Sequence, residues 1–143
     1  MASLRKEITV NAKAEQVWEV MHDIGALHTR LVPGFVVDTQ LEPGARIVTF
    51  ANGLVVRERI VTIDHDARRL VWSATGGMLT HHNGSAQVLE DGDSRTRIVW
   101  MADLLPDSAV EAIDDMMNHG MTAMQAALDL PSHHERHRVT QRS

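Results

Sequence analysis

The chain has 143 residues, 43% of them hydrophobic, and 19 acidic against 14 basic side chains give it a formal net charge of −5. This length suits one domain, and the acidic balance argues against a nucleic-acid partner, which needs clustered Lys and Arg. The absence of cysteine excludes disulfides, thiolate chemistry and cysteine-based metal sites.

Helix and strand patterns follow one another in a simple order. The predicted elements are a strand over 5–10, a helix that begins near residue 11, a short helix over 26–31, and strands over 35–40, 46–51, 54–63, 70–75, 81–89 and 96–102. Most of the strands are separated by short turns rich in Gly, Pro, Asn or Asp, and Asn52-Gly53 is the strongest hairpin signal.

A long helix is predicted after the last strand. Its apolar residues recur at helical spacing: Val110, Ile113, Met116, Met117, Met121, Met124 and Leu128. Ser108 and Glu111 have the spacing of a capping box, which would start the helix there. About 22 residues would make a helix of roughly 33 Å, long enough to cross a sheet.

Consecutive strands with short turns predict an antiparallel sheet, and helices grouped at the two ends of the sheet region predict an α+β fold. The long C-terminal helix must then cover one face of a strongly curved sheet. We expect a single domain over residues 1–130 and a flexible polar tail over 131–143.

The opening residues Met1–Glu7 lack the apolar run of a secretory signal, and no segment is long and apolar enough to span a bilayer. We therefore expect a cytoplasmic protein. In the tail, His133, His134 and His137 have spacings that could bind metal, but a flexible polar segment explains them better. We expect neither metal nor cofactor.

Glu58 is the most informative residue. Alternation over 54–63 places it on one face with Leu54, Val56, Ile60 and Thr62, and places Arg57 and Arg59 on the other. The arginines suit a solvated face, so Glu58 is predicted to point inward. A buried carboxylate is costly unless something polar meets it, and a ligand cavity supplies such a partner. The alternatives are a strand turned over, or an edge strand with a structural Glu–Arg pair.

The order of elements and several motifs resemble the START-like (SRPBCC) superfamily, in particular the bacterial polyketide cyclase/dehydrase-like group, relatives of the plant abscisic-acid receptors. The resemblance covers about residues 3–130. The residues that carry it are Val17-Trp18-Glu19-Val20, Val56-Arg57-Glu58-Arg59-Ile60, Asp64 to Leu70, Gly76-Gly77, Asn83, Thr96-Arg97-Ile98-Val99-Trp100 and the final helix.

The resemblance implies a helix-grip fold, in which the curved sheet wraps around the long helix and leaves a cavity between them. It implies that Glu58 points into this cavity, that Asn52–Leu54 is a shortened gate loop and that 77–81 is the loop opposite. Gly84 stands where the receptors carry a Tyr, and Val32 where they carry a ligand-pairing Lys. Binding of the plant hormone is therefore not implied.

Strand and helix periodicity together predict the residues that line the cavity. Besides Glu58, they are Trp72, Ala74, Ala86, Ile98, Trp100, Met116, Gly120 and Met124. Ordinary core packing is the alternative for each of them. Gly120 costs about 1 kcal/mol in a helix relative to Ala, so it either leaves room for a ligand or allows close packing against Trp72 or Trp100.

His81 and His82 are adjacent at a strand start and must point to opposite sides. We expect His81 to face the cavity mouth, where it could carry a proton; a solvated histidine is the alternative.

The leading interpretation is a binding domain for a small apolar or amphipathic ligand. An alternative is a cyclase, dehydratase or isomerase in which Glu58 is the general acid or base and His81 assists. A third is a protein-interaction module whose cavity is filled by side chains. A homodimer is left open.

Overall fold

The computed structural model describes residues 1–129 of the chain. Its elements are β1 (Ala2–Val10), α1 (Ala14–His22), η1 (Ile24–Ala26), η2 (Leu27–Leu31), β2 (Val36–Glu42), β3 (Ala45–Phe50), β4 (Val55–Asp64), β5 (Arg69–Thr75), β6 (His81–Glu90), β7 (Thr96–Leu105), η3 (Asp107–Ala109) and α2 (Val110–Leu128). The strands form one antiparallel sheet in the order β1-β7-β6-β5-β4-β3-β2. The predicted α+β fold, with short helices after the first strand and a long C-terminal helix, is confirmed.

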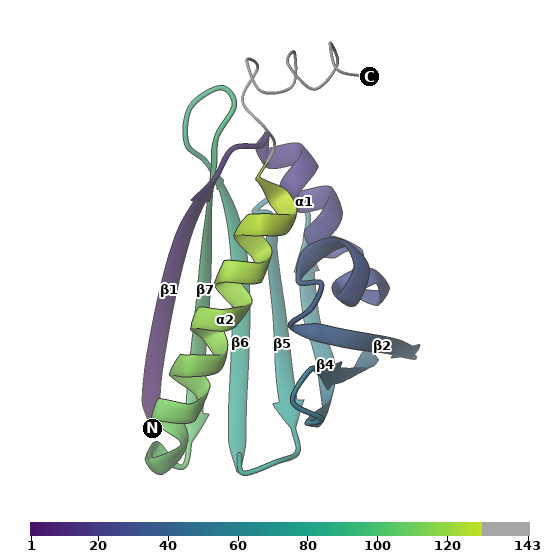
Figure 1. Cartoon of the computed structure of the whole chain (residues 1–143), viewed down its shortest axis with the longest axis vertical. Coiled ribbons are helices and arrows are strands. Elements are labelled where there is room, and N and C mark those ends of the chain that lie inside the picture. Colours follow the sequence, from purple (N-terminus) through teal and green to yellow (C-terminus); the bar gives the residue numbers. More distant parts are fainter. Residues whose placement is uncertain (130–143) are drawn as a thin grey trace.

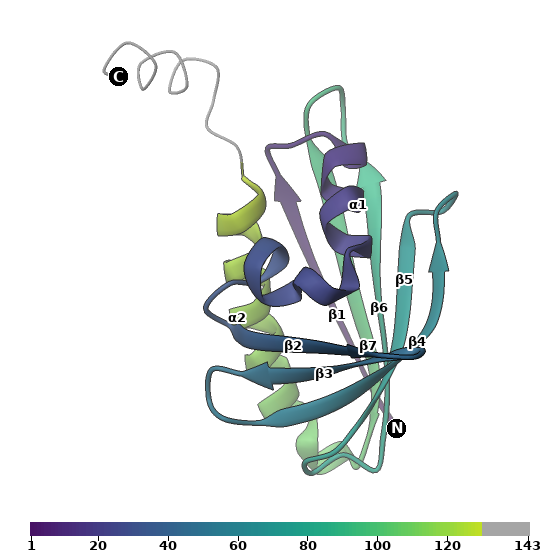
Figure 2. The ribbon, with the colours of Figure 1, turned by 90° about the vertical axis from the view of Figure 1, so that its right-hand side faces the viewer.

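The sheet is strongly bent. Helix α2 runs across the face formed by β1, β7 and β6 (Figure 1), and β2 and β3 run across the direction of those strands (Figure 2). Irregular pairing between Ile60 and Thr62 of β4 marks one place where the ladder is disturbed, and such irregularities increase local bending and twist. The bent sheet therefore surrounds α2 on more than one side.

The start of α2 differs from the prediction. The helix begins at Val110 and has 19 residues, so it is about 28 Å long. Ser108 lies in the preceding turn η3, and Ala109 holds the N-cap position without a side-chain hydrogen bond. The capping box is not formed, because the turn moves the first helical residue past the position that Ser108 would cap.

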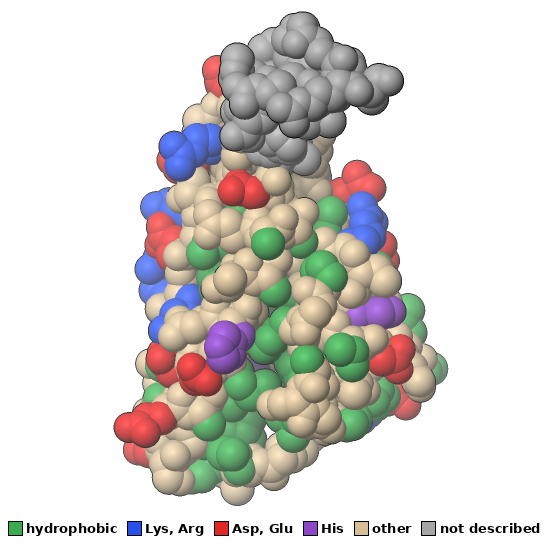
Figure 3. Space-filling view, in the orientation of Figure 1, with side chains coloured by type: hydrophobic (Ala, Val, Ile, Leu, Met, Phe, Trp, Pro, Cys, Tyr) green, Lys and Arg blue, Asp and Glu red, His purple; other side chains and the backbone are tan. Residues whose placement is uncertain are grey.

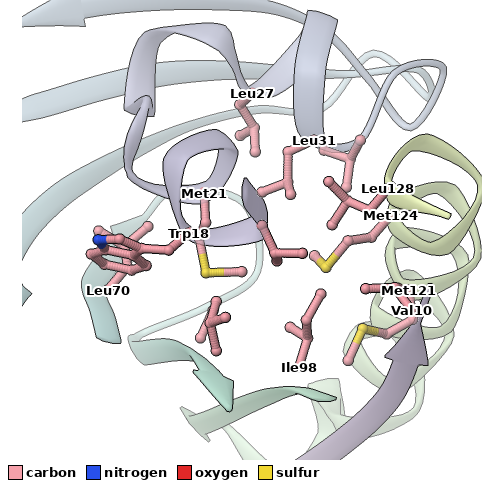
Figure 4. Close-up of a cluster of buried hydrophobic side chains, with 14 of the residues drawn as sticks. Val10, Trp18, Met21, Leu27, Leu31, Leu70, Ile98, Met121, Met124 and Leu128 are labelled. Atoms are coloured by element: carbon pink, nitrogen blue, oxygen red, sulfur yellow. The ribbon is translucent and has the colours of Figure 1, made fainter. Parts of the chain in front are cut away.

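The core occupies one end of the molecule. Side chains of α1, η2 and the C-terminal half of α2 come together there over the sheet (Figure 4), among them Met21, Leu31, Met124 and Leu128. Each fully buried Leu or Met side chain contributes about 1.5–3 kcal/mol. The N-terminal half of α2 contributes little to this cluster. The cluster therefore does not fill the space between that half of the helix and the sheet.

Residues 131–143, which include His133, His134 and His137, lie outside the residues that the structure describes. The expectations of a flexible polar tail there stay predictions. Among the helices of residues 1–129, none has the length and hydropathy that a membrane crossing would require.

Candidate ligand cavity

A cavity of about 200 Å³ lies between the N-terminal half of α2 and the sheet. Its walls are mostly apolar. They are formed by Phe35, Phe50, Leu54, Val56, Glu58, Trp72, Ala74, Gly76, Gly77, Met78, Leu79, His82, Trp100, Ala112, Ile113, Met116 and Met117. We call this space the outer chamber. Its presence argues against the alternative in which side chains fill the cavity.

A smaller inner chamber of about 70 Å³ lies toward the core. It is lined from η2, β2, β3 and α2, and Val32, Arg46 and Met124 belong to its walls. Five residues line both chambers: Phe35, Phe50, Glu58, Trp72 and Trp100. Glu58 therefore lies at the junction, where one carboxylate can face both spaces.

The cavity adjoins the surface beside α2. A groove of about 570 Å³ runs between the helix and the segments 33–35 and 50–52, and shares Phe35, Phe50 and Met116 with the outer chamber. Figure 3 shows this face hollowed beside α2, with hydrophobic side chains in the hollow. Asp115 and His119 also line the groove, so polar groups lie at the edge of a largely apolar groove that adjoins the outer chamber.

The two segments that the family resemblance assigns as loops around the mouth do line the outer chamber. Leu54 follows the Asn52-Gly53 turn, and Gly76 to Leu79 connect β5 to β6. A Cβ at Gly77 would lie 3.4 Å from Leu54 Cδ1, so these segments approach each other closely. Gly77 has a φ of 63°, a conformation that side chains other than Gly rarely adopt.

Glu58 points inward, as the alternation of β4 indicates, and it is paired with Arg46. The Arg46 Nε donates a hydrogen bond of 2.8 Å to Glu58 Oε1, and the two side chains are only 4% and 10% exposed. Arg46 Nη1 also reaches the Ile24 carbonyl at 3.3 Å. The structural Glu–Arg pair considered from the sequence thus exists together with the inward orientation, in the interior of the sheet.

Sequence reasoning did not identify Arg46. The signal was available, because alternation in β3 places Arg46 on the same face as the buried Val48. What the sequence does not show is the register, in which Arg46 stands directly opposite Glu58. The guanidinium also lies 5.9 Å from the centre of the Trp72 ring, close enough for a cation–π contact.

The prediction that His81 faces the cavity is wrong. His81 is exposed, whereas His82 is 9% exposed and lines the outer chamber. The reason is the period of two: Ala86 lies on the inner face of β6, so residues at even positions share that face. Burial lowers the pKa of the His82 imidazole, and the nearby charge of Glu58 offsets part of this effect.

Two residues that line the outer chamber each have one buried polar atom without a hydrogen-bond partner within residues 1–129. The atoms are His82 Nδ1 and Trp100 Nε1. Buried polar atoms in native proteins nearly always have partners. A polar group of a ligand is one way in which these two atoms can be satisfied.

The predicted lining residues divide into two groups. Trp72, Ala74, Ala86, Trp100, Met116 and Met124 line one or both chambers. Ile98 is instead fully buried in the core cluster. Gly120 lines neither chamber, because a Cβ there would lie 2.7 Å from the Trp100 ring and 3.1 Å from Phe35. Of the two interpretations of Gly120, close packing against Trp100 is the one observed.

Gly84 has a similar role in the sheet. A Cβ at this position would lie 2.5 Å from the Trp72 ring, so the ring rests directly on the backbone of β6. The absence of a side chain at Gly84 leaves room for the Trp72 ring, which lines both chambers. In the residues that the structure describes, no group of three or more metal-ligating side chains is present.

The architecture is that of a helix-grip protein, and comparisons with known proteins agree. A protein called XoxI from Bacillus cereus is 20% identical, with a TM-score of 0.80 over 90% of this chain and 96% of that one. A START superfamily protein from Mycobacterium smegmatis is 13% identical, with a TM-score of 0.73 over 88% and 96%. Norcoclaurine synthase from Thalictrum flavum, in complex with dopamine and hydroxybenzaldehyde, is 19% identical, with a TM-score of 0.69 over 89% and 83%.

Residues 1–130 match the family described as polyketide cyclase / dehydrase and lipid transport. The chain therefore belongs to this START-like family, as the sequence motifs suggested. No curated protein matches the chain in sequence.

Proposed function

We propose that this protein binds a small, mostly apolar molecule in the outer chamber. One observation carries the proposal: an apolar cavity of about 200 Å³ ends on the paired carboxylate of Glu58. Apolar walls with a few convergent polar groups are typical of small-molecule sites. The family description, which includes lipid transport, supports the proposal.

Binding can be tested with 2-methylnaphthalene, a purely apolar probe of two fused rings. Two lining residues, Trp72 and Trp100, report on it through their fluorescence. We expect saturable quenching and a rise in the melting temperature with probe concentration. Ala112→Trp places a large ring at the cavity wall and should weaken binding at least tenfold. Ala127→Trp is the matched control, an exposed alanine of the same helix that lines neither chamber.

Unsaturable quenching, or equal binding by the two tryptophan variants, would contradict the proposal. Native mass spectrometry of protein purified from its own host adds the identity of the ligand, since a retained molecule reports its mass. Cytoplasmic location and a homodimer stay predictions.

Catalysis is the second candidate, as a cyclase, dehydratase or isomerase acting on a polyketide-like or aromatic molecule with Glu58 as general acid or base. The observation that favours it is a second titratable group, His82. This residue lines the same chamber, and the nearby charge of Glu58 raises its pKa against the lowering effect of burial. His82 takes the assisting role first assigned to His81. If the retained ligand is converted to a product, Glu58→Gln should reduce turnover by about 10² or more while binding persists. Equal turnover in the variant would exclude this role.

A further inference from the structure

The inner face of the sheet carries one row of polar side chains that crosses several strands. Arg46 is paired with Glu58, and Glu58 with Ala74. Between β5 and β6, Trp72 is paired with Gly84 and Ser73 with Asn83, where the recorded pairing ends. Ala74 and His82 are the next residue of each strand beyond this pair, and both line the outer chamber. The row therefore reads Arg46, Glu58, Ala74, His82.

Ala74 makes a gap in this row. Neighbouring strands lie about 4.8 Å apart, so the backbones of Glu58 and His82 are roughly 10 Å apart with only a methyl group between them. Both flanking side chains are longer than that methyl group. Glu58, Ala74 and His82 all line the outer chamber, so the gap opens into the cavity. We call it the Ala74 niche.

The polar atoms beside the niche require particular partners. Glu58 Oε1 already accepts from Arg46, and an ionised carboxylate can accept further hydrogen bonds at its other oxygen. His82 Nδ1 is buried without a partner in the described chain. A hydroxyl group can donate to one neighbour and accept from another at the same time, so it fits between a carboxylate and an imidazole.

The charges around the niche disfavour an anionic ligand. Arg46 is the one Lys or Arg among the lining residues of the two chambers, and it is already paired with Glu58. A ligand carboxylate placed over Ala74 would meet the charge of Glu58 with no unpaired cation beside it, at a cost that burial increases.

We propose that the cavity selects a neutral, hydroxyl-bearing molecule whose hydroxyl group occupies the Ala74 niche, donates to Glu58 and hydrogen-bonds to His82. This inference rests on the proposed function and adds the chemical class of the ligand. It assigns Ala74 and His82 as the residues that determine specificity.

The test compares three probes of similar shape: 2-naphthol, 2-methylnaphthalene and 2-naphthoate. The native protein should bind 2-naphthol about tenfold more tightly than 2-methylnaphthalene, the value of one net hydrogen bond, and 2-naphthoate least tightly. Ala74→Val fills the niche, and His82→Phe removes the nitrogen. Each should reduce the ratio of the two affinities, 2-naphthol over 2-methylnaphthalene, from about ten to about one in the same variant. A cooperative urea unfolding transition verifies separately that each variant is folded.

Matched controls lie on the opposite face of the same strands. Ser73→Val and His81→Phe alter the residues next to Ala74 and His82, and both should keep the tenfold preference. Equal affinities of native protein for 2-naphthol and 2-methylnaphthalene would overturn the niche and leave the cavity intact. Failure of all three probes to bind would overturn the proposed function and the niche with it. If Ala74→Val does not fold, His82→Phe against His81→Phe decides the question.

Discussion

Arg46 and Glu58 form a buried ion pair directly across two neighbouring strands, with 2.8 Å between Nε and Oε1. The pair explains how a carboxylate is tolerated on the inner face of the sheet. A buried pair contributes little net stability, but removal of one partner leaves an uncompensated charge. The carboxylate of Glu58 borders both chambers. Its pairing with Arg46 therefore also sets the charge that a ligand in either chamber would contact.

Replacement of Arg46 alone should therefore be costly. We expect Arg46→Met to lower the free energy of unfolding by about 3–5 kcal/mol, and Arg46→Met with Glu58→Leu to recover most of the loss, as measured by urea unfolding. Arg57→Met is the control: its pair with Glu42 at 2.7 Å is substantially exposed, so its loss should be about 1 kcal/mol or less. Equal losses for the two single variants would contradict the importance of burial.

Gly120 should resist substitution although it lies within a helix. Alanine improves helix propensity by about 1 kcal/mol, but its Cβ would lie 2.7 Å from the Trp100 ring. We expect Gly120→Ala to destabilise the protein by about 1–3 kcal/mol through overpacking, measured by thermal or urea unfolding. His119→Ala, at the neighbouring exposed position, should change stability by less than about 0.5 kcal/mol. A stabilised Gly120→Ala would show that space remains beside Trp100.

Gly84 and Trp72 should be energetically coupled. The Cβ of Gly84→Ala would lie 2.5 Å from the Trp72 ring, so the ring must move and the walls of both chambers with it. We expect a loss of about 1–3 kcal/mol and weaker binding of 2-methylnaphthalene. In a Trp72→Leu background the same substitution should cost much less, giving a coupling energy above about 0.5 kcal/mol. Additive effects would show that the ring is displaced without cost.

His82 should make stability depend on pH. Burial lowers its pKa below the ordinary value of 6.5, so below that pH the unfolded chain binds a proton that the folded protein does not. Above about pH 7, His82 is neutral in both the folded and the unfolded chain and should not lower the free energy of unfolding. As the pH drops through and below 6.5, the free energy of unfolding should fall. Glu58 and Asp103 oppose the lowered pKa, and His81 adds to it.

The measurement is urea unfolding between pH 7.5 and about pH 5. The difference between native protein and His82→Phe removes the contribution of the other titratable groups, and it should change with pH in this window. The His81→Phe variant retains His82, so its stability should still fall as the pH drops through 6.5. Parallel stability curves for the native protein and His82→Phe would contradict the prediction.

The sequence by itself determined the elements, their order and the inner face of β4. These are consequences of local periodicity: a period of two places Glu58 opposite Arg57 and Arg59, and the helical spacing of apolar residues identifies α2. The order of strands with short turns was sufficient for the antiparallel α+β sheet, and the motifs were sufficient for the family.

Only the tertiary structure decided which residues meet. Arg46 faces Glu58 because register joins positions on different strands that no local pattern relates. His82 faces the cavity in place of His81 for a local reason, since it shares the inner face of β6 with Ala86. Ile98 and Gly120 are residue types expected of a cavity wall, one apolar and one small. Ile98 nevertheless packs in the core, and Gly120 packs against Trp100. Whether an inward residue borders space or another side chain depends on the volumes of all its neighbours, and those neighbours come from distant parts of the chain.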